Sequence, residues 1–332
     1  MAALMAALHP QLGPLSPAVV SEPEDFDRFW ARTLREARGY DPEARTIERV
    51  VVDQPLTELR YWDFSFSGFG GQRVNAWLSR PARDLTEVLP CVVQIPGYGR
   101  GRGLPGEAPH LAAAGMAHLL LDVRGQGCGY GSGGDTPDPH DGAPEAPGVV
   151  TRGIASPETY YYRRLIVDAV RSVDAVRTLP DIDAERIIVM GNSQGGGVTL
   201  AVAGLVPDLC GVTVSVPFLC DVPAVYQSAQ GEPYAELARY LAVRRTERER
   251  VFHTLAYVDG VNHARRAQAP SLWGLGLRDT CCPTVGGQQA LAAYAGPAQA
   301  EIYPDNGHEG GEFFYLRRQL AWIRERCAAP TH

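Results

Sequence analysis

Residues 186–197 read RIIVMGNSQGGG, and this stretch decides the fold. Its apolar first half is typical of a buried strand, and residues 194–205, which follow, predict a helix. Between the two stands Ser193, flanked by Gly191 and Gly195 in the pattern Gly-x-Ser-x-Gly. A serine on so tight a strand-to-helix turn has strained backbone angles, and the glycines let the strand and the helix approach closely. The stretch therefore predicts a nucleophile elbow that lifts the Ser193 hydroxyl into a cleft.

Outward from the elbow, short apolar strands alternate with helical stretches, which is typical of a parallel βα arrangement. Three earlier stretches alternate or run apolar between Gly and Pro signals, as antiparallel strands do. Strands are predicted at residues 49–53, 61–66, 73–78, 91–95, 117–122, 186–190, 212–216, 271–277 and 299–303, and helices at 23–37, 160–179, 194–205 and 312–326. The pattern favours the α/β class, with an α/β-hydrolase fold in which helices flank a mostly parallel central sheet.

The whole chain, residues 1–332, is predicted to form a single domain, because no repeat and no low-complexity linker marks a second one. Residues 1–45 form an N-terminal extension that carries the first helix. Two segments interrupt the βα pattern: residues 125–153 are rich in Gly and Pro, and residues 221–269 are polar and rich in Glu and Arg. We expect both to be excursions over the active face, with residues 221–269 an insert near the active site.

The composition argues against several classes of function. A formal net charge of −7, with no clustered excess of basic side chains, argues against a nucleic-acid partner. All 31 basic residues are Arg, which removes lysine nucleophiles and Schiff-base chemistry. Nowhere do about 18 apolar residues run together, so we expect no spanning helix and no membrane partner.

The cysteines and the N-terminus bear on the compartment. The chain has seven cysteines, an odd number, scattered without metal-ligand spacing, so we expect no metal. Cys281 and Cys282 are adjacent, and buried free thiols are favoured over a redox pair there. Residues 1–8 are apolar but lack a basic region, which makes them a poor signal peptide. The expected location is the cytoplasm.

A serine hydroxyl is a weak nucleophile at neutral pH and needs a base within hydrogen-bond reach. His308 follows the last predicted strand through a turn-rich loop and precedes the last helix, where α/β hydrolases place their base. The orienting acid should stand at the end of a strand between Ser and His in chain order, and Asp279 fits this position. The sequence therefore predicts the triad Ser193, Asp279 and His308.

Other residues remain alternatives at this point. Asp305 shares a loop with His308 and is the second candidate for the acid, while Asp259 lies in the insert. His118 begins an apolar strand and is favoured as a core or cap residue. His253 and His263 lie in the insert and are weaker candidates for lining the substrate cleft.

The oxyanion of a tetrahedral intermediate needs preorganised N–H donors, one from the residue after the nucleophile and one from the loop after an earlier strand. These are the backbone N–H groups of Gln194 and Tyr98, the latter in the loop Pro96-Gly97-Tyr98-Gly99. Arg124 follows another strand and could support the elbow or this loop by charge-assisted hydrogen bonds. Taken alone, a structural salt bridge is the favoured interpretation of Arg124.

Together these residues resemble carbohydrate esterase family 7, the acetyl xylan esterases and cephalosporin-C deacetylases. An Arg-Gly-Gln motif, a Gly-x-Ser-Gln-Gly elbow and a His-Glu pair mark that family. Here they stand, in the family's order, as Arg124-Gly125-Gln126, the elbow around Ser193, and His308-Glu309. By this resemblance Ser193, Asp279 and His308 are the triad, Tyr98 and Gln194 are the oxyanion donors, and Gln126 and Glu309 belong to the supporting residues.

The resemblance implies removal of acetyl groups from small acetylated carbohydrates such as xylo-oligosaccharides, and from cephalosporin C, without a metal or other cofactor. It also implies a homo-oligomer, a hexamer in the family. Two departures from the family are the run before Pro17 and the pair Cys281-Cys282, which stands beside the acid and can reshape the acyl pocket. The rival functions are an oligopeptidase-like peptidase, a general short-chain carboxylesterase, and a catalytically dead binding protein on the same fold.

Overall fold

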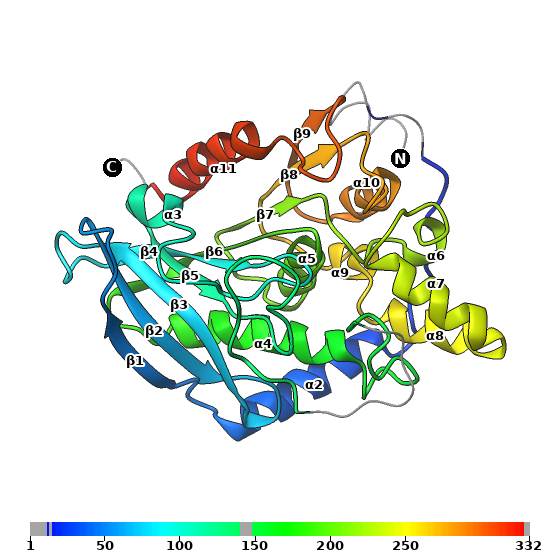
Figure 1. Ribbon diagram of the computed structural model, residues 1–332, viewed down its shortest axis with the longest axis horizontal. Helices are drawn as coiled ribbons and strands as arrows, with labels where there is room; N and C mark the ends of the chain where they lie inside the picture. Colours follow the sequence, from blue (N-terminus) through cyan, green and yellow to red (C-terminus); the bar gives the residue numbers. More distant parts are fainter. Residues whose placement is uncertain (1–11, 13–14, 140–147, 329–332) are drawn as a thin grey trace.

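A nine-stranded sheet forms the centre of the computed structural model, which describes residues 12, 15–139 and 148–328 (Figure 1). The strand order is β1-β2-β3-β5-β4-β6-β7-β8-β9, and pairing is antiparallel from β1 to β5 in this order and parallel from β5 to β9. The strands are β1 (Thr46–Val52), β2 (Leu59–Ser67), β3 (Arg73–Pro81), β4 (Leu89–Ile95), β5 (Ala117–Leu121), β6 (Ile182–Asn192), β7 (Gly211–Ser215), β8 (Ser271–Gly276) and β9 (Ala298–Tyr303). The predicted α/β-hydrolase class, with its mostly parallel sheet, is confirmed.

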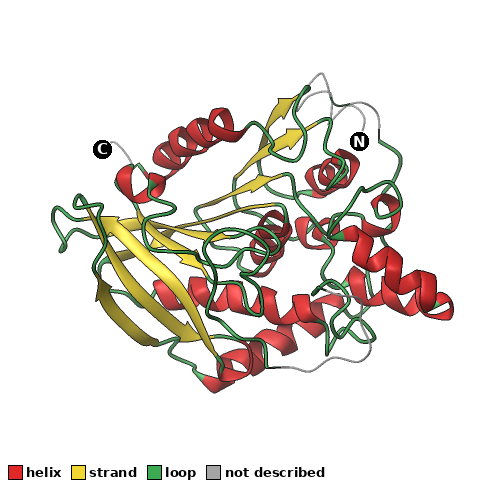
Figure 2. Ribbon diagram, in the orientation of Figure 1, coloured by secondary structure: helices red, strands yellow, loops and turns green. Residues whose placement is uncertain are grey.

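Helices cover both faces of the sheet (Figure 2). On one face lie α4 (Tyr161–Val176) and α5 (Gln194–Leu205), with α2 (Phe26–Tyr40) packed outside α4; on the other lie α3 (His110–Ala113) and α11 (Glu312–Cys327) (Figure 1). The remaining helices are η1 (Phe69–Gly71), α6 (Val222–Val225), α7 (Tyr234–Val243), η2 (Arg245–Glu247), α8 (Arg248–Ala256), α9 (Gly260–Ala264) and α10 (Thr284–Ala293).

The central strand β6 shows how the sequence builds these layers. Successive side chains of a strand point to opposite faces of the sheet. Ile187 and Val189 accordingly join the large core that contains α4 and α5, whereas Ile188 and Met190 join the smaller core beneath α3 and α11. All four side chains are buried, which explains why an unbroken apolar run precedes the serine.

The predicted start of this strand was wrong by four residues. β6 begins at Ile182 rather than at residue 186, because Leu89 of β4 pairs with Ile182 before the register shifts. Residues 183–186 are partly or fully exposed, so this end of the strand carries polar side chains that gave no apolar signal.

The predicted insert, residues 221–269, contains α6 to α9 and is only partly an excursion. Its last helix, α9, packs against α5 so closely that a Cβ on Gly204 would meet the carbonyl of His263 at 2.6 Å. The Trp30 indole of α2 donates a hydrogen bond to the carbonyl of Tyr257 at 2.8 Å. Parts of the predicted excursions and extension, namely residues 1–11, 13–14 and 140–147, lie outside the described residues.

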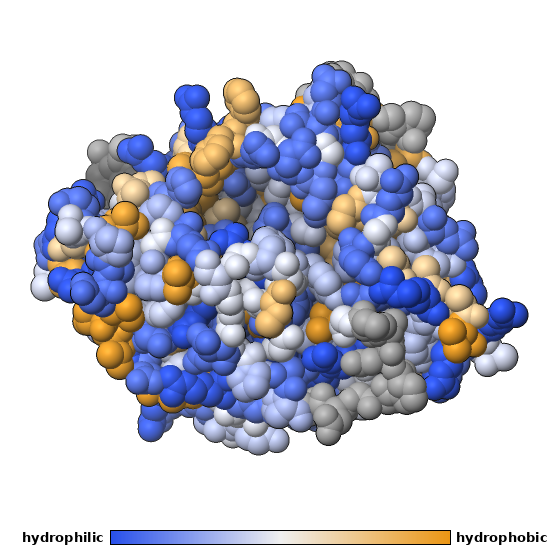
Figure 3. Space-filling view, viewed as in Figure 1, coloured by the Kyte–Doolittle hydropathy of each residue, from blue (hydrophilic) through white to orange (hydrophobic). Residues whose placement is uncertain are grey.

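The surface in view is mainly hydrophilic, with small separate apolar areas (Figure 3). Among the helices of the described residues, none combines the length and the apolar character needed to cross a lipid bilayer.

Candidate active site

Ser193 occupies a strained turn between β6 and α5. Its backbone angles are φ 54° and ψ −119°, a region that non-glycine residues rarely adopt. The turn is held by two backbone hydrogen bonds, from Ser193 N–H to the Ser215 carbonyl and from Phe218 N–H to the Ser193 carbonyl, both 2.9 Å. These hydrogen bonds hold the backbone of Ser193 in its strained conformation and thereby fix the position of the hydroxyl.

The two glycines predicted in the elbow stand where there is no room for a side chain. A Cβ on Gly195 would lie 1.9 Å from the carbonyl oxygen of Ile95 in β4, and a Cβ on Gly191 would lie 2.3 Å from the carbonyl of Gly195. Both distances are far below van der Waals contact, so only glycine lets α5 leave the strand so steeply.

The residues predicted as a triad lie within hydrogen-bond distance of one another. His308 Nε2 is 2.9 Å from Ser193 Oγ, and His308 Nδ1 is 2.8 Å from Asp279 Oδ2. Ser193, Asp279 and His308 follow β6, β8 and β9, which are parallel strands, so their carboxyl ends meet at the same edge of the sheet. The arrangement fits an imidazole that donates from Nδ1 to the carboxylate and accepts the serine proton at Nε2.

The acid is held by its own loop. The Asp279 side chain is 1% exposed, and its second oxygen, Oδ1, accepts the backbone N–H groups of Cys281 and Cys282 at 2.9 and 2.8 Å. Asp305, the second candidate for the acid, is exposed. Asp259 is buried in the insert and accepts the backbone N–H groups of neighbouring turns there, so its contacts are structural.

Electrostatics favour the protonated form of His308. Burial alone would lower the pKa of His308, but the hydrogen bond to Asp279 and the adjacent Cys281 side chain outweigh burial and raise this pKa above its ordinary value. A carboxylate that stabilises the imidazolium is what a base needs when it takes a proton from a hydroxyl.

The predicted oxyanion donors lie in the loop after β4 and at the start of α5. Among the hydrogen bonds of the described residues, the backbone N–H groups of Tyr98 and Gln194 donate to no acceptor. Buried backbone donors are normally paired, so two open N–H groups beside the elbow are available to a ligand oxygen.

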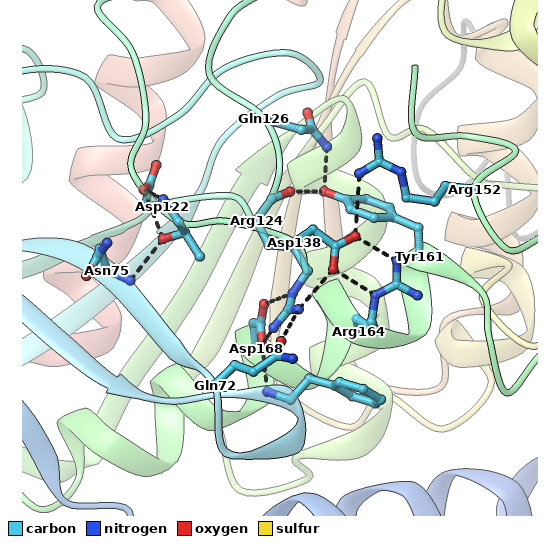
Figure 4. Close-up of polar contacts among 12 residues, drawn as sticks. Gln72, Asn75, Asp122, Arg124, Gln126, Asp138, Arg152, Tyr161, Arg164 and Asp168 are labelled. Atoms are coloured by element: carbon cyan, nitrogen blue, oxygen red, sulfur yellow. Dashed lines mark hydrogen bonds and ion pairs between the residues drawn. The ribbon is translucent and has the colours of Figure 1, made fainter. Parts of the chain in front are cut away.

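Gln126 connects these two donor segments. Its Oε1 accepts the N–H of Gly99 at 2.6 Å, and its Nε2 donates to Gln194 Oε1 at 2.9 Å and to the Tyr161 hydroxyl at 2.8 Å. The Tyr161 hydroxyl in turn donates to the carbonyl of Arg124 at 2.6 Å (Figure 4). The Arg-Gly-Gln motif therefore fixes the loop that carries Tyr98 relative to the elbow, through the side chain of Gln126.

Arg124 itself makes the structural salt bridge that the sequence favoured. Its guanidinium, fully buried, donates two bonds to Asp168 of α4 at 2.5 and 2.8 Å and lies 3.2 Å from Asp138 (Figure 4). Arg164 also pairs with Asp138 at 2.7 Å. Burial alone would raise the pKa of Asp138, but Arg164 and Arg124 hold it below its ordinary value. The cluster anchors the chain after β5 to α4.

One supporting contact gave no signal in the sequence. The Tyr98 hydroxyl donates to Glu236 Oε1 in α7 and accepts the N–H of Val149 at 3.0 Å, while Glu236 Oε2 accepts the N–H of Val150 at 2.9 Å. Glu236 thus joins the insert to the loop that carries Tyr98 and to the backbone of Val150. No sequence pattern marks the one Glu of α7 as the partner of a tyrosine 138 residues away along the chain.

The other predicted residues have structural roles. Glu309 is exposed and accepts bonds from the N–H of Gly307 and from Asn306, which shapes the loop before the base. His118 is a core residue, and burial lowers its pKa to about 4. His263 is buried among aromatic rings of α2 rather than in a cleft, so this alternative was wrong; His253 stacks edge-on against Tyr257.

The adjacent cysteines lie at the triad. Cys282 Sγ is 3.9 Å from Ser193 Oγ, and the sulfurs of Cys281 and Cys282 and a ring nitrogen of His308 all lie within 4.8 Å of one another. The spacing of cysteines along the chain did not predict this group, because its members come from the ends of two different strands. It is a set of residues that could hold a metal ion.

A glycine-flanked serine stands on a strained turn after β6, a central strand of the parallel part of the sheet, and a histidine and an aspartate converge on it. This arrangement defines the class of the α/β hydrolases. Comparison with known proteins gives the family. A sequence model described as acetyl xylan esterase (AXE1) matches residues 17–326, which is most of the chain. The chain belongs to this family and is a carboxylic ester hydrolase.

Individual relatives agree with this assignment. The acetyl esterase Axe7A of Xylanibacter ruminicola is 27% identical over 317 residues, covering 92% of this chain and 67% of the relative. The acetyl xylan esterase of Paenibacillus sp. R4 superposes with a TM-score of 0.86 at 33% identity, covering 93% of this chain and 96% of that one. Acetyl xylan esterase 1 of Thermoanaerobacterium sp. JW/SL YS485 gives a TM-score of 0.84 at 30% identity, covering 94% and 96%.

Proposed function

We propose that this enzyme removes acetyl groups from small acetylated carbohydrates, in particular xylo-oligosaccharides, through an acyl-enzyme on Ser193. The observation that carries the proposal is a pair of hydrogen bonds made by His308: Nε2 lies 2.9 Å from Ser193 Oγ, and Nδ1 lies 2.8 Å from Asp279 Oδ2. The carbohydrate half of the substrate is supported by the family and by the relatives that act as acetyl xylan esterases.

The geometry supports acyl transfer in two halves. In the first, His308 Nε2 takes the hydroxyl proton as Ser193 Oγ attacks the acetyl carbonyl, and the N–H groups of Tyr98 and Gln194 stabilise the oxyanion. The imidazolium, stabilised by Asp279, then protonates the departing sugar oxygen. In the second half His308 activates a water that releases acetate and restores the serine.

The decisive test is the substitution Ser193→Ala. We expect hydrolysis of p-nitrophenyl acetate to fall by roughly three or more orders of magnitude, because a nucleophile of a triad acts as a unit with its base. The Ser156→Ala variant, changed at the surface, is the matched control and should retain its rate. Equal rates in both variants would contradict the assignment.

The substrate class needs a separate measurement. Acetylated xylo-oligosaccharides, cephalosporin C and esters with longer acyl chains should be compared by kcat/KM. We propose that the acetylated sugars and cephalosporin C are cleaved and that longer acyl chains are disfavoured. Preference for long-chain esters would instead indicate a general carboxylesterase, and hydrolysis of blocked peptides would indicate a peptidase.

We also propose that the chain is a single domain, that it works in the cytoplasm and that it assembles into a homo-oligomer, a hexamer by family resemblance. The first point is supported by the large buried cluster, which includes residues of α2, of the sheet and of the insert. The second rests on the seven cysteines, all of which are free. Light scattering of the purified protein gives its mass directly, and a monomer would contradict the third point.

A further inference from the structure

The mechanism leaves the two thiols at the triad without a role. Cys282 is buried, and its sulfur lies 3.9 Å from Ser193 Oγ. Cys281 is half-buried, so it can be reached from solvent. Together with a ring nitrogen of His308, their sulfurs form a group whose ligand atoms all lie within 4.8 Å of one another.

The positions of these thiols are fixed by the loop of the acid. Both backbone N–H groups are bound to Asp279 Oδ1, at 2.9 and 2.8 Å, so the two residues cannot leave the site without disturbing Asp279. The Cys281 thiol also points to the carbonyl of Glu232, at 3.4 Å. The ligand atoms are therefore preorganised on a turn rather than carried by a mobile segment.

We infer that Cys281, Cys282 and His308 form a binding site for a thiophilic divalent cation such as Zn²⁺, and that occupation of this site stops ester hydrolysis. Zn²⁺ is bound by cysteine sulfur at about 2.3 Å and by histidine nitrogen at about 2.0–2.1 Å, and sites of two cysteines and one histidine with an open fourth position are known. Ligand atoms on one tetrahedral ion lie about 3.5–3.8 Å apart by these bond lengths, so the distances between the ligand atoms have to shorten by about 1.3 Å at most.

Binding has a defined proton balance. The two thiols each lose a proton to solvent, and so does His308 where it is protonated, because only neutral imidazole binds a metal. Two sulfur–metal bonds and one nitrogen–metal bond form, and water completes the coordination of the ion. No oxidant or reductant takes part.

Inhibition follows from the two nitrogens of His308. Nε2 faces Ser193 Oγ and Nδ1 faces Asp279 Oδ2, so both are engaged in the relay. Whichever nitrogen the cation takes, one of these two hydrogen bonds is lost. The bound ion therefore removes either the base from the serine or the carboxylate from the base.

The binding arm of the test uses Zn²⁺ itself and does not depend on catalysis. Isothermal titration calorimetry of the wild type, in buffers with different ionisation enthalpies, should show binding with proton release. Cys281→Ser should weaken binding at least about tenfold. Substituting a residue that only hydrogen-bonds to a metal-binding side chain already costs that much affinity, and Cys281 would bind the metal itself. Cys128→Ser, which changes an exposed thiol elsewhere, is the matched control and should bind as the wild type does. Equal affinity of Cys281→Ser and wild type would overturn the site.

The activity arm rests on the proposed function. Zn²⁺ should inhibit hydrolysis of p-nitrophenyl acetate by the wild type, and EDTA should restore it; each variant is compared with its own metal-free rate. Cys281→Ser should need at least about tenfold more Zn²⁺ for half-inhibition, in line with its weaker binding. Tight binding without inhibition would overturn the inhibitory role.

The two proposals can fail separately. Zn²⁺ should bind Ser193→Ala as tightly as it binds the wild type, because the serine is not a ligand. If Ser193→Ala keeps its esterase rate but binds Zn²⁺, the proposed nucleophile is wrong and the cation site is supported. If Ser193→Ala is inactive and the wild type binds no Zn²⁺, the nucleophile is supported and the cation site is wrong.

Discussion

At the scale of single residues, the site depends on a carboxylate that directs an imidazole. Asp279 gives one oxygen to His308 and the other to two backbone N–H groups, so its orientation is fixed from both sides. The Asp279→Asn variant keeps the shape but can hold the imidazole in the wrong tautomer. We expect kcat for p-nitrophenyl acetate to fall by about 10³–10⁴.

The control for this variant lies in the loop of the base. Asp305→Asn changes an exposed carboxylate three residues before His308 and should leave kcat close to that of the wild type. A large loss in Asp305→Asn together with a small loss in Asp279→Asn would exchange the roles of the two acids.

The protonation of His308 predicts a pH dependence. The base must be neutral, so kcat/KM for a non-ionising ester should rise with pH as His308 loses its proton. Because Asp279 and Cys281 raise the pKa of His308, the midpoint of this rise should lie above the ordinary value of 6.5. Cys281→Ser removes one of these contributions and should move the midpoint to lower pH; a move to higher pH would contradict this account.

Chain order and position were enough to select Ser193, Asp279 and His308, which lie together in the structure, because the fold places each after a parallel strand. The contacts of Gln126 could not be predicted in the same way. It depends on contacts to Gly99 and Gln194, which lie 27 and 68 residues away along the chain, and on the packing of two loops that carry no periodic pattern.

At the scale of secondary-structure elements, α4 is unusual because it carries charged side chains on a buried helix. It is almost entirely buried and still carries Asp168 and Arg164, which are paired with Arg124 and Asp138. Buried charges are tolerated when each is paired and hydrogen-bonded, whereas removing one partner leaves a desolvated charge. The helix itself was predicted from its apolar spacing, but the spacing could not indicate that its charged positions are buried.

This network predicts a large loss of stability from one substitution. Arg124→Leu leaves the buried carboxylate of Asp168 without its main partner and should lower the free energy of unfolding by about 3–5 kcal/mol, measured by urea denaturation. Arg28→Leu is the control: Arg28 is 82% exposed and 3.8 Å from Asp25, so its removal should cost at most about 1 kcal/mol. Similar costs for both variants would contradict the importance of burial.

At the scale of the whole molecule, one core connects the N-terminal segment to the last strand. The same buried cluster contains Leu12, residues of α2, α4 and α5, residues of the insert, and Ile302 in β9. Because no separate core exists for the insert among the described residues, the insert should not unfold by itself. Scanning calorimetry should show one transition with equal calorimetric and van't Hoff enthalpies; two resolved transitions would contradict the single-domain proposal.

The sequence predicted that the insert, residues 221–269, is a polar excursion at the surface. In the structure about half of its residues are buried. The difference arises because α9 is short, so its few buried residues give no measurable periodicity. Burial there is imposed by α5 and α2, which come from other parts of the chain.

The contact of Glu236 with Tyr98 has a practical consequence for protein engineering. A designer who shortens residues 221–269, or who replaces them with the corresponding segment of a relative, also removes the carboxylate that accepts the hydrogen bond of the Tyr98 hydroxyl. The insert and the loop that carries Tyr98 therefore cannot be redesigned independently of each other. A library that varies the insert should keep position 236 fixed, or should randomise positions 98 and 236 together.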